Sequence, residues 1–94
     1  MSYRLRFDKR AYKEWIKLDS VVKNQFKKKL VERLEQPILE SSKVLGADNC
    51  YKIKLKSAGY RLVYQVIDNE LVVLVLAVGK HERNAVYKAA LKRV

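Results

Sequence analysis

The 94-residue chain has few of the residues that most often build metal, redox or nucleotide sites. It contains one cysteine (Cys50), one histidine (His81) and three dispersed glycines, at positions 46, 59 and 79. A single cysteine can form neither an internal disulfide nor a thiolate metal cluster, which agrees with a reducing compartment. The dispersed glycines do not form a phosphate-cradling loop. We therefore expect no metal, no cofactor and no nucleotide hydrolysis, and we expect Cys50 to be a small packing residue.

Long apolar segments are also missing. The longest apolar run, from Leu71 to Val78, is far shorter than the roughly 20 residues that a membrane-spanning helix needs. The first ten residues, MSYRLRFDKR, alternate charged and apolar side chains and lack the apolar core of a secretory signal. We expect a cytoplasmic protein without a membrane segment. Ninety-four residues with 49% hydrophobic composition suit one modest core, so residues 1–94 are predicted to form a single domain.

Negative charge is scarce. Ten Asp and Glu residues face 21 Lys and Arg residues, which gives a formal net charge of +11. A field of this sign attracts phosphate backbones or an acidic protein partner. A high net charge can also serve only to keep a protein soluble. The positions of the cations along the chain are therefore needed to distinguish binding of a polyanion from solubility.

The N-terminal third predicts a strand and two helices. Residues 2–7 alternate with the period of a strand. Asp8 then caps a short helix whose apolar face contains Ala11, Trp15 and Leu18, joined by Tyr12 and Ile16. Ser20 is the predicted N-cap of a longer helix that ends by Pro37, with an apolar face of Val22, Phe26, Leu30 and Leu34. We expect these two helices to form an antiparallel hairpin.

The remaining residues predict three strands and a last helix. Residues 37–49 form an irregular connection, and Ser57-Ala58-Gly59 turns the strand before it into a second strand, Tyr60 to Ile67. Asp68-Asn69 leads into the apolar run Leu71 to Val78, a strand expected to be covered on both faces. A C-terminal helix should present Val86, Ala90 and Val94, with Leu91 beside them. This order favours an α+β domain with a mainly antiparallel β-sheet packed against an N-terminal helical hairpin.

The segment from Tyr51 to Val66 carries the strongest functional signal. In a strand, Tyr51, Ile53 and Leu55 enter the core, whereas Lys52, Lys54 and Lys56 project together from the other face. Such a row of cations repels itself, and a polyanion that binds it removes that cost. RNA is the leading candidate. Lysines on an exposed helix face, such as Lys27, Lys28 and Lys29, are more often simply solvated.

The residues permit RNA cleavage without a metal. In that reaction the ribose 2′-hydroxyl attacks the adjacent phosphate, which requires a base, an acid and cations that stabilise the phosphorane. One histidine cannot fill both proton roles. Lysines whose pKa is lowered by neighbouring cations, and a tyrosine in a similar field, are the remaining candidates. We expect the hairpin and the following segment to gather a shallow basic site of six residues: Lys52, Lys54, Arg61, His81, Arg83 and Tyr87.

Several stretches of the chain resemble the RelE family of bacterial toxins. They are KEW and KL in the first helix, KKKLVE in the second, CYKIKLKSAGYRLVYQVID in the hairpin, and VGK, ER and VY near the end. The long hairpin block is highly specific, and the resemblance covers nearly the whole chain. It implies a small α+β fold related to microbial ribonucleases and an mRNA interferase that cuts messenger RNA in the ribosomal A site, which inhibits translation.

The resemblance also implies roles for individual residues. Lys52 and Lys54 would contribute proton abstraction and charge stabilisation, Arg61 would hold the phosphate, and Tyr87 would orient or deprotonate the nucleophile; the identity of the base stays open. His81 stands where close relatives have an arginine thought to protonate the leaving oxygen. Either His81 is the acid or the chemistry is impaired. Further phosphate or RNA contacts are expected from Lys56, Lys80 and Arg83.

Partners follow from the same resemblance. The family implies a cognate RelB-like antitoxin, a ribosome contacted at its 16S rRNA and its A-site mRNA, and operator DNA bound only through the toxin–antitoxin complex. Lys27, Lys28 and Lys29 would contact ribosomal RNA. Ile38 and Leu45 are apolar where the family commonly has basic residues. Two alternatives remain: a non-catalytic RNA- or ribosome-binding protein, and a degenerate toxin retained for antitoxin binding and operon control.

Overall fold

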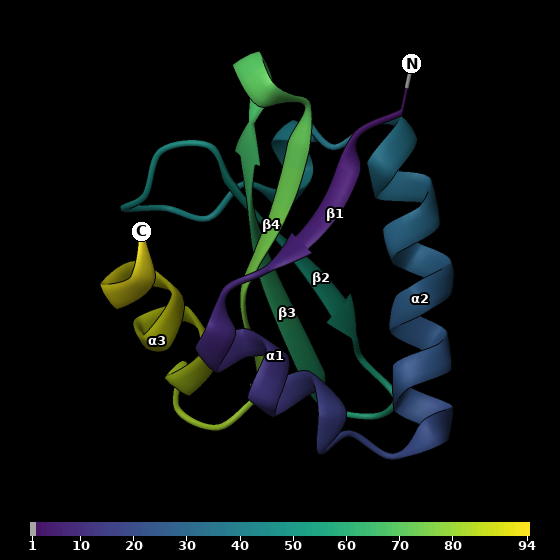
Figure 1. Cartoon of the computed structure of the whole chain (residues 1–94). Coiled ribbons are helices and arrows are strands. Elements are labelled where there is room, and N and C mark those ends of the chain that lie inside the picture. The colour runs from purple at the N-terminus through teal and green to yellow at the C-terminus, as the bar shows by residue number, and fades with distance from the viewer. Residues whose placement is uncertain (1) are drawn as a thin grey trace.

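The structure is a computed structural model that describes residues 2–94 (Figure 1). Its elements follow the order β1 (Arg4–Phe7), α1 (Lys9–Ile16), α2 (Ser20–Glu35), β2 (Cys50–Leu55), β3 (Tyr60–Ile67), β4 (Val72–Lys80) and α3 (Ala85–Arg93). Short 3₁₀ turns at Glu40–Ser42 and Asp68–Glu70 interrupt two of the connections. This is the predicted α+β order of strand, two helices, three strands and helix.

One four-stranded sheet forms the centre of the domain, with strand order β1-β4-β3-β2. β2 pairs with β3, and β3 with β4, in antiparallel orientation, whereas β1 lies parallel to β4. β4 is therefore an interior strand along its first half. β4 is also covered on both faces, as expected, because Val73, Val75 and Val78 lie in one apolar core and Leu76 and Ala77 in another. Burial on both faces explains its uninterrupted apolar sequence.

Each face of the sheet has its own apolar core. One core packs α1 and α2 against the sheet through Ala11, Trp15, Val22, Phe26 and Leu30. The other packs α3 and the connection before β2 against the opposite face, and its buried members are Val44, Cys50, Val63, Leu76, Ala77, Val86 and Ala90. Cys50 is 1% exposed, as predicted for a packing residue. The sheet thus separates the face of the two N-terminal helices from the face of α3.

A β-bulge interrupts the pairing of β3 with β4. Val63 pairs with Ala77 but its neighbour Tyr64 pairs with Val75, so Leu76 is an extra residue in β4. Both Leu76 and Ala77 consequently pack on the α3 side, and Val78 returns to the side of α1 and α2. The bulge changes the phase of β4 halfway along its length.

The two N-terminal helices begin at aspartates. Asp8 is the N-cap of α1, as predicted, and its carboxylate accepts a hydrogen bond from the Arg10 amide at 2.9 Å. The predicted N-cap of α2, Ser20, is wrong: Asp19 is the cap, and its Oδ1 accepts from the Val22 amide at 3.0 Å. A carboxylate at this position also interacts favourably with the positive end of the helix dipole, so it outcompetes the neighbouring hydroxyl.

The helical pair differs from the expected antiparallel hairpin. α1 and α2 follow one another through a tight turn and contribute to the same core, and the Trp15 and Phe26 rings lie 6.3 Å apart. Figure 1 shows α1 crossing one end of the sheet while α2 runs along the side of β2, so the helices are inclined to each other. α1 consequently buries a narrow stripe, and Tyr12 and Ile16 are exposed rather than part of the core.

The C-terminal helix also buries less than its sequence suggested. Val86 and Ala90 are buried, but Leu91 is 42% and Val94 58% exposed. The buried residues of α3 are thus four apart, and Tyr87 and Ala89 pack against the same core while partly exposed. None of the helices within residues 2–94 combines the length and apolar character needed to cross a membrane.

The assignment of the α2 cap leads to a stability prediction. Replacing Asp19 by alanine removes the acceptor of the Val22 amide, so Asp19→Ala should lower the free energy of unfolding by about 1 kcal/mol. Ser20→Ala is the matched control and should change stability by less than about 0.5 kcal/mol. Urea denaturation followed by circular dichroism measures both; a larger loss for Ser20→Ala than for Asp19→Ala would contradict the assignment.

Candidate active site

The hairpin of β2 and β3 holds a group of cations on the α3 face of the sheet. Tyr51, Ile53 and Leu55 are buried on the opposite face, as predicted, with exposures of 5%, 1% and 7%. Lys52 and Lys54 alternate with them and therefore project toward the α3 side. Arg61 pairs directly with Lys54 across the antiparallel ladder, so these two side chains leave the same face.

Two aromatic rings from outside the hairpin meet these cations. α3 presents Tyr87, and the Lys52 Nζ lies 5.9 Å from the centre of its ring. The ring of His81 lies 6.1 Å from the Tyr87 ring in an edge-on arrangement. The backbone amide of His81 donates to the Gly59 carbonyl at 2.7 Å, which fastens the end of β4 to the hairpin turn. The chain thus brings residues of β2, β3 and α3 to one place.

The proximity of the cations changes the acidity of Lys54. Its pKa is lowered from the ordinary lysine value, chiefly by the positive charge of Lys52, then by desolvation, and further by Arg61 and Lys56. The ion pairs seen among residues 2–94, Asp8–Arg10 and Glu14–Arg93, leave all four of these cations uncompensated. A lowered pKa increases the fraction of Lys54 that is neutral at a given pH, and a neutral amine can accept a proton.

Arg61 has a donor that the fold itself does not use. Its Nη1 donates to the Tyr60 carbonyl at 2.9 Å, but its Nε is buried and makes no hydrogen bond within residues 2–94. Arg61 pairs with Lys54 and adds its permanent positive charge to the cluster, so it is suited to interact with a phosphate beside Lys54.

Arg33 of α2 forms hydrogen bonds to the hairpin of β2 and β3, a role that the sequence analysis missed. Its Nη1 donates to the Lys52 carbonyl at 3.2 Å and to the Tyr64 hydroxyl at 2.9 Å. Its Nη2 donates to Ser42 Oγ at 3.3 Å. The spacing offered a signal, since Arg33 follows Leu30 by three residues and so lies beside the buried stripe. Arg33 fixes the backbone from which Lys52 projects.

The structure connects only some of the remaining predicted residues with this centre. Lys56 is close enough to influence Lys54, and Lys80 pairs with Tyr60 at the end of β4. Arg83 is exposed in the turn before α3, where its backbone has a positive φ of 48°. Lys27, Lys28 and Lys29 are exposed on α2. Of these three, Lys28 and Lys29 share a groove of about 640 Å³ with Lys54 and Lys56, whereas Lys27 does not line it.

A second hollow lies on the α3 side of Lys52. It has a volume of about 420 Å³ and is lined by Val44, Leu45, Lys52, Asn84, Tyr87, Lys88 and Leu91. Lys52 also lines a smaller groove of about 270 Å³ together with Arg33, Lys54 and Lys56. Three hollows therefore adjoin these cations, and an extended strand of nucleic acid can follow such a series of grooves along a basic surface.

Comparison with known proteins identifies the class to which this fold and site belong. Residues 5–85 match the family model described as the ParE toxin of the type II toxin–antitoxin system parDE. The chain belongs to this family of toxins.

The similarity to individual proteins extends over the whole chain. It is 61% identical over 94 residues to the mRNA interferase toxin RelE of Escherichia coli strain K12, which covers 100% of this chain and 99% of that protein. A structure of an E. coli RelE variant with two arginine-to-alanine substitutions, in the free state, matches with a TM-score of 0.92, 60% identity and coverage of 100% and 99%. In the intact E. coli RelBE toxin–antitoxin complex, the match has a TM-score of 0.84 and 62% identity, over 87% of this chain and 100% of that one. The expected resemblance to RelE toxins is confirmed.

The electrostatic arrangement leads to a prediction for Lys54. Since Lys52 is the largest cause of its lowered pKa, Lys52→Met should raise the pKa of Lys54 toward the ordinary lysine value. NMR titration of the side-chain Cε and Nζ signals measures the shift. Lys23→Met, on α2 and outside the cluster, is the control and should leave the Lys54 titration in place. An unchanged titration in Lys52→Met would remove the electrostatic argument.

Proposed function

We propose that this protein is the toxin of a type II toxin–antitoxin system and acts as a ribosome-dependent endoribonuclease that cuts messenger RNA in the A site and thereby inhibits translation. One observation supports this function above the others. The chain is 61% identical over its full length to an mRNA interferase toxin, and the same chain gathers Lys52, Lys54, Arg61 and Tyr87 on one face of the sheet.

The reaction is a transesterification. The ribose 2′ oxygen attacks the adjacent phosphorus, the bond between phosphorus and the 5′ oxygen breaks, and the products carry a 2′,3′-cyclic phosphate and a 5′-hydroxyl. A base takes the proton of the 2′-hydroxyl, and an acid gives a proton to the departing 5′ oxygen. Negative charge that develops on the phosphorane is stabilised by cations held in place beforehand.

The geometry suggests how these tasks are divided. Lys54, with its lowered pKa, takes the 2′ proton. Lys52 and Arg61 stabilise the phosphorane through their positive charge. Tyr87, whose ring lies beside the Lys52 ammonium, orients the nucleophile. Lys56, Lys80 and Arg83 add positive charge along the RNA, and Lys27, Lys28 and Lys29 contact ribosomal RNA.

His81 is the proposed acid. Imidazolium is a competent proton donor, and the His81 ring lies edge-on to Tyr87 at the margin of the cluster. The reaction then proceeds with a histidine in the place for which the resemblance implied an arginine. If His81 cannot serve, the chain is a degenerate toxin that still binds its antitoxin.

The partners proposed for the chain are an antitoxin, the ribosome and, through the antitoxin, operator DNA. E. coli RelE has been solved in complex with its antitoxin RelB and with a peptide of that antitoxin. For this chain we propose a RelB-like antitoxin with an acidic or amphipathic segment, because the net charge of +11 favours such a partner. The place of action is the cytoplasm, where ribosomes translate messenger RNA.

A site variant separates cleavage from mere occupancy of the ribosome. Tyr87→Phe removes the hydroxyl that orients the nucleophile, so it should slow cleavage of A-site mRNA about 100-fold or more while ribosome binding stays intact. Single-turnover cleavage and cosedimentation with programmed ribosomes measure the two properties. Tyr12→Phe, on the exposed face of α1, is the matched control and should cleave at the rate of the parent protein.

Arg61→Ala should have a similar effect on cleavage, since it removes the donor proposed for the phosphate. Translation arrest without cut ends in the parent protein would favour the non-catalytic RNA-binding alternative. Equal cleavage of free RNA without ribosomes would contradict the ribosome dependence.

Substitution of His81 tests the proposed acid. His81→Ala should slow the single-turnover rate about 100-fold, because the 5′ oxygen then leaves without a protonated donor, and His81→Arg should restore part of the rate. Glu82→Ala is the control, since Glu82 is the exposed neighbour in the same turn. A parent protein that is inactive and becomes active as His81→Arg would identify a degenerate toxin. Undiminished cleavage by His81→Ala would remove His81 from the mechanism.

A further inference from the structure

The paired edge of β4 ends before the strand does. β1 pairs with β4 only from Val72 to Val75, whereas β4 continues to Lys80. The amide of Asp8 donates to the Val75 carbonyl as the last backbone contact at the end of β1. Beyond this point, no strand within residues 2–94 lies along that edge of β4, and its backbone groups need other partners.

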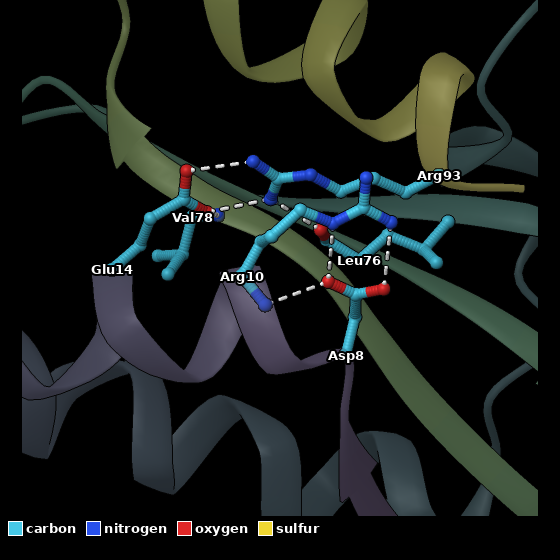
Figure 2. A network of polar contacts seen from close by, with 6 residues as sticks. All are labelled: Asp8, Arg10, Glu14, Leu76, Val78 and Arg93. Atoms are coloured by element: carbon cyan, nitrogen blue, oxygen red, sulfur yellow. Dashed lines mark hydrogen bonds and ion pairs between the residues drawn. The ribbon is translucent and has the colours of Figure 1, made fainter.

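Two charged side chains supply these partners. Glu14 of α1 accepts a hydrogen bond from the Val78 amide at 3.3 Å through Oε1. Arg93 of α3 donates to the Leu76 carbonyl at 2.8 Å through Nη1. Figure 2 shows both side chains meeting over this stretch of β4, and they replace the strand that β1 does not provide.

Glu14 and Arg93 also bind each other. The Arg93 Nη1 lies 2.9 Å from Glu14 Oε1, and Nη2 lies 3.2 Å from Oε2. This two-point contact between a guanidinium and a carboxylate has fixed geometry, and the Arg93 side chain is only 12% exposed. Since α1 and α3 pack on opposite faces of the sheet, the pair clamps the two helices around the open edge of β4.

α3 is short and packs on the sheet through few side chains. Val86 and Ala90 are buried and Tyr87 and Ala89 are partly buried, and a helix of nine residues is not stable by itself. Tyr87 lies on this helix, about 9 Å along the axis from Arg93. The direction of α3, and with it the place of the Tyr87 ring beside Lys52, therefore depends on the clamp at the far end of the helix.

We propose that the Glu14–Arg93 ion pair is a positioning device that fixes α3 on the edge of β4 and holds Tyr87 in its reactive place beside Lys52. The proposal rests on the function proposed above for Tyr87. Neither Glu14 nor Arg93 touches the substrate in it; both act through the orientation of α3. A small displacement of a reacting or orienting group is enough to slow an enzyme strongly.

The clamp predicts a loss of rate without a loss of binding. Arg93→Ala and Glu14→Ala should each lower the single-turnover rate constant on A-site mRNA about tenfold or more, while the concentration of ribosomes for half-saturation stays within about twofold. The double variant should be no slower than the slower single variant, because the two residues act as one unit. Lys92→Ala, which removes a neighbouring exposed charge from the same helix, is the matched control and should retain the parent rate.

A second measurement keeps this test separate from the proposed function. NMR spectra of the isolated protein should show shifted Tyr87 ring signals and faster amide exchange in α3 for Arg93→Ala, with the amides of β2 and β3 unchanged. Arg93→Lys retains a donor and should show a smaller effect. If the parent protein makes no cut ends, the proposed function fails, but these spectra still test the clamp. Unchanged Tyr87 signals, or equal losses of rate and ribosome binding, would overturn the clamp.

Discussion

Burial of one face of β2 makes the cluster of cations on its other face possible. Tyr51, Ile53 and Leu55 are almost fully buried, and burial of each such side chain contributes roughly 1.5–3 kcal/mol. Repulsion between two unit charges 4 Å apart in water is about 1 kcal/mol. The free energy gained by burying the apolar face therefore exceeds the cost of repulsion, and β2 holds Lys52 and Lys54 close together despite their like charge. The lowered pKa of Lys54 records the repulsion that remains.

The parts of the fold that could be predicted from the sequence are those set by local periodicity. The two-residue alternation in the hairpin predicted which of its side chains are buried. The unbroken apolar run predicted that β4 is covered on both faces. Contacts between distant segments were not accessible in this way. The exposure of Tyr12 and Ile16 depends on how α1 packs against the sheet and α2, which the periodicity of one helix does not describe. The choice of Asp19 over Ser20 as a cap differs by one residue and is settled by side-chain geometry.

The candidate site could likewise be predicted only where local periodicity places its residues. Lys52, Lys54 and Arg61 could be placed together from strand pairing alone, since alternation and a tight turn bring them to one face. Their meeting with His81 and Tyr87 was also expected, but that expectation rested on an assumed path of the chain after β4, because periodicity does not describe this path. The contacts of Arg33 with β2 and Tyr64 could not be predicted, because a cation on a helix usually faces water. Glu14 and Arg93 are 79 positions apart in the sequence. They meet at the part of β4 that β1, which ends at Phe7, leaves without a neighbouring strand within residues 2–94.

The position of β2 at the margin of the sheet has a consequence for self-association. An unpaired edge strand is a template on which a second copy of the chain can add its own strand. Here the Lys43–Tyr51 bridge and the Arg33 contact with the Lys52 carbonyl cover part of that edge. Lys52, Lys54 and Lys56 place positive charge along the strand, so a second copy would approach against like charge. The residues proposed to act on RNA thus also help to keep the free protein from stacking edge to edge.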